Sequence, residues 1–207
     1  MKKYIWTLTM TAAGVILAVT GNGVMAQARG GTSVSTFTDS RDGKVYKKVT
    51  IGKRVWMAEN LNYDVPDVAT DVCYGNIQDS CAKYGRLYNW ETAQKACPAG
   101  WRLPSDREWT ALENTVGRST AGIKLKSSDG WKDNGNGTDN YGFLALPSGN
   151  GIFANNFNST GSLGWWWSAT EIDAEHAWGR GMHYDYEDVY RGINYKTLLY
   201  SVRCVQN

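Results

Sequence analysis

The stretch Ala93–Glu113, AQKACPAGWRLPSDREWTALE, decides the fold because it combines the end of one helix, a sharp turn and the start of a second helix. The first helix is predicted to begin after Asn89, its N-cap, and to end before Pro98. Ser105 and Glu108 form the S-x-x-E capping box that opens the second helix. Each helix has one apolar face, so we expect both to pack on a common partner, which we predict to be a sheet.

Antiparallel strands are expected on both sides of this helix pair. Before it, two turn signals, Asp42-Gly43 and Gly52-Lys53, separate runs of strand-forming residues and predict a three-stranded meander over 37–57. After it, an acidic turn is expected to join one or two strands within 171–192. Alternating apolar residues predict a last strand over 198–205.

The first 28 residues have the layout of a secretory signal peptide, with Lys2 and Lys3, an uncharged run and the small-residue cleavage motif Ala26-Gln27-Ala28. A retained membrane anchor is the alternative, but threonine and glycine dilute the run below a good spanning helix. We read 29–35 as a linker and 36–207 as one domain. The protein is therefore expected to be secreted or on the cell surface, with no membrane span after cleavage.

The amino-acid composition limits the classes of molecule that the protein is expected to bind. The chain has 22 basic and 20 acidic side chains, a balance that argues against nucleic acid as the main partner. It also has 10 tryptophans and 12 tyrosines against 4 phenylalanines, and such rings with polar handles suit half-buried surfaces and binding faces. The alternative is that large rings simply cover small, Gly-rich loops.

Four cysteines, Cys73, Cys81, Cys97 and Cys204, form an even set behind a secretory leader, for which disulfides are the default. Four cysteines allow three pairings, and spacing alone does not choose among them. We expect Cys73 to pair with Cys81 across a short loop, and Cys97 with Cys204, tying the first helix to the last strand. A zinc site is the alternative, but there is no C-x-x-C pair and both histidines are distant in sequence.

A tryptophan-rich segment, GWWWSAT at 164–170, is the second prominent feature. In a strand, Trp165 and Trp167 share one face and Trp166 takes the other, so one face is expected in the core and the other can be exposed. An exposed ring beside amide and carboxylate groups is a platform for a sugar ring. The expected ligand-binding residues are Trp131, Asn134, Asn136, Trp166 and Tyr184. The alternative is that protein covers both faces.

The Gly/Asn/Asp-rich loop at 125–151 offers a calcium site as a further hypothesis. Its candidate ligands are Asp133, Asn134, Asn136 and Asp139, whose side-chain oxygens suit a hard cation. The spacing does not fit an EF-hand, because glycines occupy ligand positions. A loop held by Asx turns is the competing interpretation. No other cofactor is expected.

Catalytic motifs are missing from the sequence. His176 and His183 are the only imidazoles, and no nucleophile elbow, H-E-x-x-H or phosphate loop is present. A glycosidase pair is the weaker hypothesis, and its carboxylates would come from Glu171, Asp173, Glu175, Asp185, Glu187 and Asp188. Solvated acidic turns are commoner, so we predict that the protein is not an enzyme.

Six motifs, taken in order, resemble one known family. They are TFTDSRDGKVY at 36–46, VWMAENLN at 55–62, YGRLY at 84–88, CPAGWRLPS at 97–105, DNYGF at 139–143 and SVRC at 201–204. This is the Fibrobacter succinogenes major paralogous domain, and the resemblance extends from Thr36 to Val205. It implies a bacterial secreted or envelope protein and does not imply a known reaction.

A more distant resemblance concerns the fold. The helix-pair residues resemble those of C-type lectin-like domains, a last-strand cysteine matches that fold's long-range disulfide, and Arg102–Trp109 resembles the formylglycine-generating family. This implies an α+β, C-type-lectin-like fold, with two helices packed on small antiparallel sheets, long Gly/Asn-rich loops and two disulfides. The sugar-selecting triplet of calcium-dependent lectins and a catalytic cysteine pair are both missing, so neither activity carries over.

Two functional hypotheses result. The first is a non-catalytic binding module for polysaccharide or glycan that uses exposed Trp/Tyr and Asn/Asp loops. The second is a structural or protein-interaction component of the envelope with no sugar ligand, in which the aromatic residues are scaffold.

Overall fold

The computed structural model describes residues 34–68, 71–153 and 155–207, which combine β-sheets with short helices in an α+β fold. The predicted signal peptide lies outside the described residues, as does most of the predicted linker. Strand β1 begins at Val34, so the last two residues assigned to the linker belong to a strand.

The first sheet contains the predicted meander. Its order is β1-β2-β3-β13-β6, and every neighbouring pair is antiparallel. The strands are β1 (Val34–Thr38), β2 (Val45–Ile51), β3 (Arg54–Met57), β13 (Val205–Gln206) and β6 (Trp101–Arg102). Gly43 and Gly52 have φ of 75° and 62°, the left-handed conformation that the two predicted turns require. The meander prediction is confirmed.

The second sheet carries the tryptophan-rich segment at its centre. Its order is β11-β10-β9-β12-β5-β4, with β12 parallel to β9 and the other pairs antiparallel. The strands are β4 (Asp71–Val72), β5 (Leu87–Tyr88), β9 (Leu163–Glu171), β10 (His176–His183), β11 (Tyr190–Tyr195) and β12 (Tyr200–Ser201). A separate hairpin pairs β7 (Asn150–Phe153) with β8 (Asn156–Asn158).

The single last strand predicted over 198–205 is wrong. The chain instead supplies β12 to one sheet and β13 to the other, and the link between them passes through the core. Val202 and Cys204 are fully buried, and their carbonyl oxygens accept from the amides of Leu61 and Met57. One chain segment thus joins the two sheets.

Four α-helices cover the sheets, where the sequence indicated two. They are α1 (Gln78–Tyr84), α2 (Trp90–Ala96), α3 (Asp106–Val116) and α4 (Ala121–Leu125), with 3₁₀ turns at Tyr74–Asn76 and Arg118–Thr120. The side chain of Asn89 caps α2 through the Thr92 amide at 2.9 Å. The capping box of Ser105 and Glu108 opens α3. Both predicted helix starts are confirmed.

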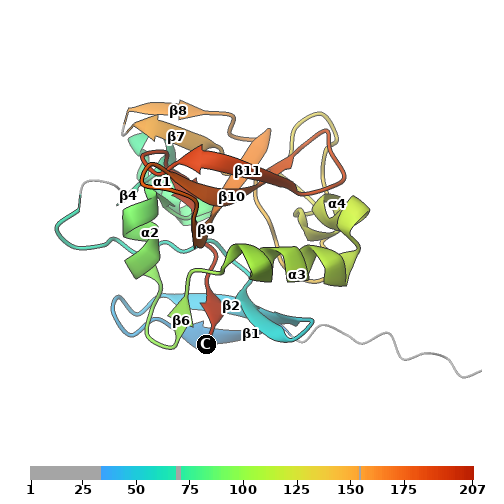
Figure 1. Cartoon of the computed structure of the whole chain (residues 1–207), viewed down its shortest axis with the longest axis horizontal. Helices are drawn as coiled ribbons and strands as arrows, with labels where there is room; N and C mark the ends of the chain where they lie inside the picture. The colour runs from blue at the N-terminus through green and yellow to red at the C-terminus, as the bar shows by residue number, and fades with distance from the viewer. Residues whose placement is uncertain (1–33, 69–70, 154) are drawn as a thin grey trace, which may run out of the picture. The chain divides into compact units, whose positions relative to one another are not determined.

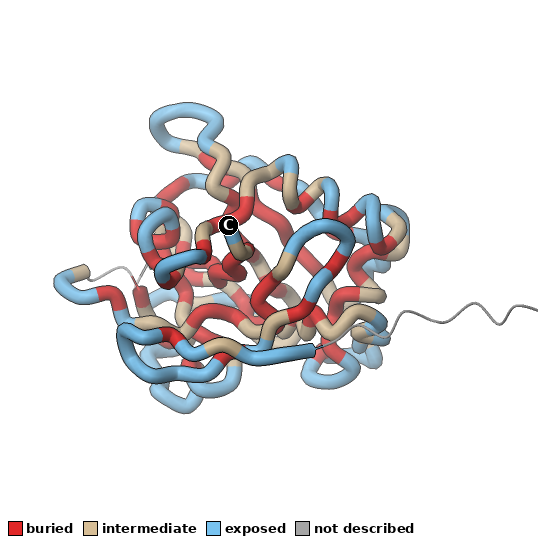
Figure 2. The backbone as a smooth tube through the Cα atoms, turned by 90° about the horizontal axis from the view of Figure 1, so that it is seen from below, coloured by how far each residue is buried: buried red, intermediate tan, exposed pale blue. Residues whose placement is uncertain are grey.

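Helix α3 lies between the two sheets (Figure 1). Its apolar face is Trp109, Leu112 and Val116, all buried as the periodicity predicts. The Trp109 ring lies 5.1 Å from that of Trp56 in β3, and its Nε1 donates to the carbonyl of Trp167 in β9. The buried stretches converge in the interior while the turns stay exposed (Figure 2). The expectation that the helix packs on a sheet is confirmed.

Both predicted disulfides are present. Cys73 pairs with Cys81, and Cys97 at the end of α2 pairs with Cys204 beside β13. Since all four cysteines are paired, none remains as a zinc ligand.

Candidate functional site

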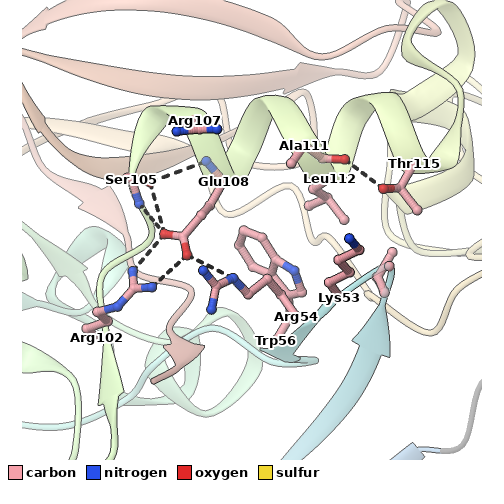
Figure 3. Close-up of a pocket in the computed structure, with 12 residues that line it drawn as sticks. Lys53, Arg54, Trp56, Arg102, Ser105, Arg107, Glu108, Ala111, Leu112 and Thr115 are labelled. Atoms are coloured by element: carbon pink, nitrogen blue, oxygen red, sulfur yellow. Dashed lines mark hydrogen bonds and ion pairs between the residues drawn. The ribbon is translucent and has the colours of Figure 1, made fainter.

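A groove with a cavity volume of about 960 Å³ lies between the β2–β3 turn and α3 (Figure 3). We call it the cationic groove, because its lining includes Lys53, Arg54, Arg102 and Arg107 but a single carboxylate, Glu108.

Glu108 organises the cationic groove. Its two carboxylate oxygens accept from Arg102 at 2.7 and 2.6 Å, Oε2 also accepts from the Ser105 amide at 3.0 Å, and the Nε of Arg54 lies 3.1 Å from Oε1. Figure 3 shows the two guanidinium groups on either side of the carboxylate. The hydrogen bonds from Arg102 lower the pKa of Glu108 from 4.5 to about 2. The carboxylate is therefore an anion at neutral pH, and it positions two arginines.

We expect Glu108→Gln to lower the free energy of unfolding at neutral pH by about 1–2 kcal/mol, because a charge-assisted pair is lost. The effect stays small because the arginine partners are 40% and 47% exposed. The folded-state pKa is depressed, so this stabilisation is present above pH 4.5 and is lost as the pH falls toward 2. Urea unfolding of both proteins at neutral and acidic pH tests this, and a difference that persists unchanged at low pH would contradict it.

A second hollow, of about 220 Å³, lies on the opposite side of the β9–β11 strands from α3. We call it the aromatic pocket. Its lining is Leu163, Trp165, Gly181, His183, Tyr186, Asp188 and Tyr190. The rings of Trp165 and Tyr190 meet at 87° with centroids 5.7 Å apart, so they form a corner rather than a flat plate. Tyr186 and Tyr190 are 58% and 61% exposed.

Glycines make room for Trp165. A Cβ at Gly181 would lie 3.1 Å from two atoms of the Trp165 ring, and one at Gly192 would lie 2.8 Å from another. The ring therefore rests directly on the backbone of β10 and β11, and a larger residue at Gly192 would displace it.

A buried lysine holds the turn that completes the aromatic pocket. Lys126 is only 2% exposed, and its Nζ donates to the carbonyl oxygens of His183, Tyr184 and Tyr186 at 3.0, 3.2 and 3.2 Å. Burial lowers the pKa of its ammonium group. This contact holds the β10–β11 turn, from which His183 and Tyr186 line the same pocket as Trp165.

Two of the predicted ligand-binding rings are not available. Trp166 is fully buried and its Nε1 donates to the Asn60 side chain at 2.8 Å, while Trp131 is 4% exposed and bonds Ser127. The prediction that Trp166 and Trp131 are exposed rings on which a sugar stacks is therefore wrong, because the core covers both side chains. Tyr184 is partly exposed and packs on the core.

The neighbouring Trp165 is the partly exposed ring of the tryptophan-rich segment, and sequence reasoning did not single it out. Trp165 and Trp167 are two residues apart in a strand and lie on the same face, so the alternation of side chains could not show which of the two is exposed. The signal was available in the glycines of the paired strands, Gly181 and Gly192, which leave a ring-sized space over the sheet.

The proposed calcium ligands are partly used within their own loop. The Asn136 side chain accepts from the Trp131 amide at 2.9 Å, and Asp139 accepts from the Leu144 amide at 2.8 Å. Burial raises the pKa of Asp139. Asp133 and Asn134 are exposed at the loop tip. Over the described ranges, no group of three or more His, Cys, Asp or Glu side chains is placed to hold a metal ion, and calcium stays a prediction.

The carboxylates of the acidic segment 171–188 have different partners in different parts of the structure. Glu171 pairs with Lys196, Asp173 bonds the His176 ring at 2.8 Å, and Asp188 lines the aromatic pocket. The glycosidase hypothesis stays untested. No helix in the described part of the chain is long and apolar enough to cross a membrane.

Comparison with known proteins identifies the family. The model of the Fibrobacter succinogenes major domain matches residues 49–206. No curated protein and no solved structure matches the chain. The matched region begins within β2, at Val49, reaches β13 and includes every residue that lines the two hollows. Because this match covers well over half of the 207 residues, the chain belongs to the Fibrobacter succinogenes major domain family.

Proposed function

We propose that this protein is a secreted or envelope-associated, non-catalytic module that binds polysaccharide or glycan through the aromatic pocket. The observation that carries the proposal is the Trp165 ring, which rests on a glycine floor beside the exposed Tyr190. Such a corner of apolar faces suits the C–H faces of a sugar ring, and His183 and Asp188 at the rim can exchange hydrogen bonds with hydroxyl groups.

Two further features support this proposal. Disulfides persist mainly in oxidising compartments, so Cys73–Cys81 and Cys97–Cys204 favour an extracytoplasmic protein. The pair of helices α2 and α3 on antiparallel sheets, tied by a long-range disulfide to the C-terminal strands, favours a C-type-lectin-like architecture.

Trp165→Ala is expected to lower the affinity for a bound glycan by roughly 10- to 100-fold, because the largest apolar contact of the pocket is removed. The protein should be titrated by calorimetry with soluble plant and bacterial polysaccharides, with and without calcium. Trp178→Ala is the matched control, since this partly exposed tryptophan of β10 points to the opposite face of the same sheet.

Gly192→Ala is a second variant, because its Cβ would push on the Trp165 ring without removing any side chain. It should weaken binding while the protein stays folded. A folded, oxidised protein that binds nothing in the panel would reject the glycan proposal, as would equal losses in Trp165→Ala and Trp178→Ala.

A second candidate function, a structural or protein-interaction component with no sugar ligand, is favoured by the open edge of β11. This strand ends the six-stranded sheet and exposes Ile193 and Tyr195 by 59% and 57%. In the register of the β10–β11 pairing, the backbone amide of Lys196 donates to the carbonyl oxygen of Glu175. Hydrogen-bonded and non-hydrogen-bonded positions alternate along an antiparallel strand, so the backbone N–H and C=O groups of Arg191 and Ile193 point away from β10. The unpaired N–H and C=O groups of such an edge can form hydrogen bonds with a strand of another chain.

A second copy fits this edge. Antiparallel pairing about Gly192 sets Arg191 opposite Ile193 of the other copy and brings no like charges together. Light scattering should then show dimers that Ile193→Lys dissociates. Val45→Lys is the control, because Val45 is equally exposed but lies in the interior strand β2. A monomer at all concentrations would reject this candidate.

A further inference from the structure

We infer that the cationic groove is a second binding site, separate from the aromatic pocket, and that it takes a carboxylate-bearing polysaccharide such as a polyuronate. The negative charge of the expected ligand follows from the cationic side chains that line the groove. The choice of a polysaccharide over an acidic peptide rests on the proposed function.

The charge of the groove differs from that of the whole chain. The chain is almost balanced, with 22 basic and 20 acidic side chains, whereas the groove lining has four cations and one carboxylate. Asp106, the neighbouring acid at the start of α3, does not compensate the groove, because its oxygens are taken up by Arg180 and Arg191. The excess positive charge is therefore local and uncompensated.

The donors of the groove are only partly used. Arg54 contacts Glu108 through Nε, and within the described part of the chain its two Nη groups make no hydrogen bond. Lys53 and Arg107 make no ion pair with any described residue. All three are exposed, so an incoming anion meets free donors at little desolvation cost.

The structure already contains a carboxylate held in the way the ligand would be held. Arg102 grips Glu108 with both Nη groups, the two-bond arrangement that a planar guanidinium makes with a carboxylate. Glu108 is also held by the amide and the hydroxyl of Ser105, and its lowered pKa keeps it ionised at neutral pH. The contact with Glu108 holds the guanidinium group of Arg54 beside the groove, where its Nη groups can meet a second carboxylate.

The floor of the groove is apolar. Ile51, Trp56 and Leu112 line it, and Figure 3 shows the Trp56 and Leu112 side chains between Arg54 and α3, with Lys53 extending toward the helix. These three side chains are only 3%, 1% and 3% exposed, so a carboxylated sugar in the groove would contact mainly the charged groups around them. The cavity volume of about 960 Å³ exceeds that of the aromatic pocket and accommodates more than one sugar unit.

The test uses polygalacturonate and the same polymer with its carboxylates methyl-esterified, each titrated by calorimetry at low and high salt. Polygalacturonate should bind, the ester should not, and salt should weaken binding. The double variant Lys53→Gln/Arg107→Gln removes two exposed, unpaired cations, so it should stay folded and bind roughly 5- to 10-fold more weakly. Thermal unfolding checks that the variant is folded.

The matched control is Lys95→Gln/Arg118→Gln, which removes the same charges from exposed positions outside the groove. An equal loss in this control would show that only net charge matters and would overturn the site. Tighter binding of polyglutamate or dextran sulfate than of polygalacturonate would overturn the carboxylated-sugar assignment, as would no binding at all.

Trp165→Ala separates the two proposals. It should leave polygalacturonate binding unchanged if the groove is a distinct site, even where the glycan proposal for the aromatic pocket fails. Loss of polygalacturonate binding in Trp165→Ala would assign the acidic polymer to the aromatic pocket and overturn the groove.

Discussion

Arg203→Met is expected to destabilise the protein by roughly 3–5 kcal/mol, because it strips the hydrogen-bond donor from a buried cluster of oxygens. Arg203 is fully buried. Its guanidinium donates to the Asn60 side chain at 2.7 and 3.1 Å, to the Met57 and Leu144 carbonyls at 3.3 and 3.2 Å, and to the Phe143 carbonyl. Methionine fills the volume and satisfies none of these acceptors.

The cation at Arg203 is retained at an energetic cost. Burial lowers the pKa of the guanidinium from 12.5 to about 9, which still leaves it charged at neutral pH. No carboxylate contacts it within the described ranges, and neutral oxygens and the Phe143 ring, 4.5 Å away, surround the charge. Five hydrogen bonds offset the desolvation, so removing the donor exposes the full penalty of the unpaired acceptors.

Thermal unfolding is the measurement for Arg203→Met. A change of 1 kcal/mol shifts the melting temperature by about 2–4 °C for a domain of this size, so a fall of roughly 6–20 °C is expected. Arg203→Lys keeps the charge but not the planar fork, and its loss should be intermediate. A methionine variant as stable as the wild type would show that these carbonyls find other partners.

Removal of the Cys97–Cys204 disulfide by a double alanine substitution is expected to cost about 2–5 kcal/mol. The two cysteines are 107 residues apart, and the chain-entropy model gives about 4.8 kcal/mol for a loop of that size. The bridge also anchors the end of α2 to the segment that joins the two sheets. Chemical denaturation of oxidised wild type and variant measures the loss.

The Cys73–Cys81 pair is the internal control. Its cysteines are 8 residues apart, for which the same model gives about 2.5 kcal/mol. Its double alanine variant should therefore lose less stability. Equal losses in both variants would contradict a loop-length origin of the effect.

These two stability predictions leave the proposed sites unaltered. Neither Arg203 nor the Cys97–Cys204 bridge lines the cationic groove or the aromatic pocket. Variants that remain folded at low temperature should therefore bind as the wild type does, which separates loss of fold from loss of ligand contacts.

Local signals made much of the fold predictable. The Asn89 cap, the capping box of Ser105 and Glu108, and the two glycine turns of the meander each depend on residues within a few positions of one another. The disulfide pairing was also predicted, although spacing alone left three choices. The short helices α1 and α4 were missed, since neither has a strong cap or a long apolar period.

The site was less predictable, because burial depends on partners that are distant in sequence. Trp166 is buried and donates a hydrogen bond to the side chain of Asn60, 106 residues earlier in the chain. Trp165, in contrast, lies over Gly181 of β10 and Gly192 of β11.

By itself, the sequence determined the family, the helix starts, the meander, and the alternation that separates Trp165 from Trp166. Only the tertiary structure decided which ring reaches solvent, that the chain end is divided between two sheets, and that four cations line one groove. The physical reason is that alternation assigns a side chain to a face, while exposure depends on what the rest of the chain packs against that face.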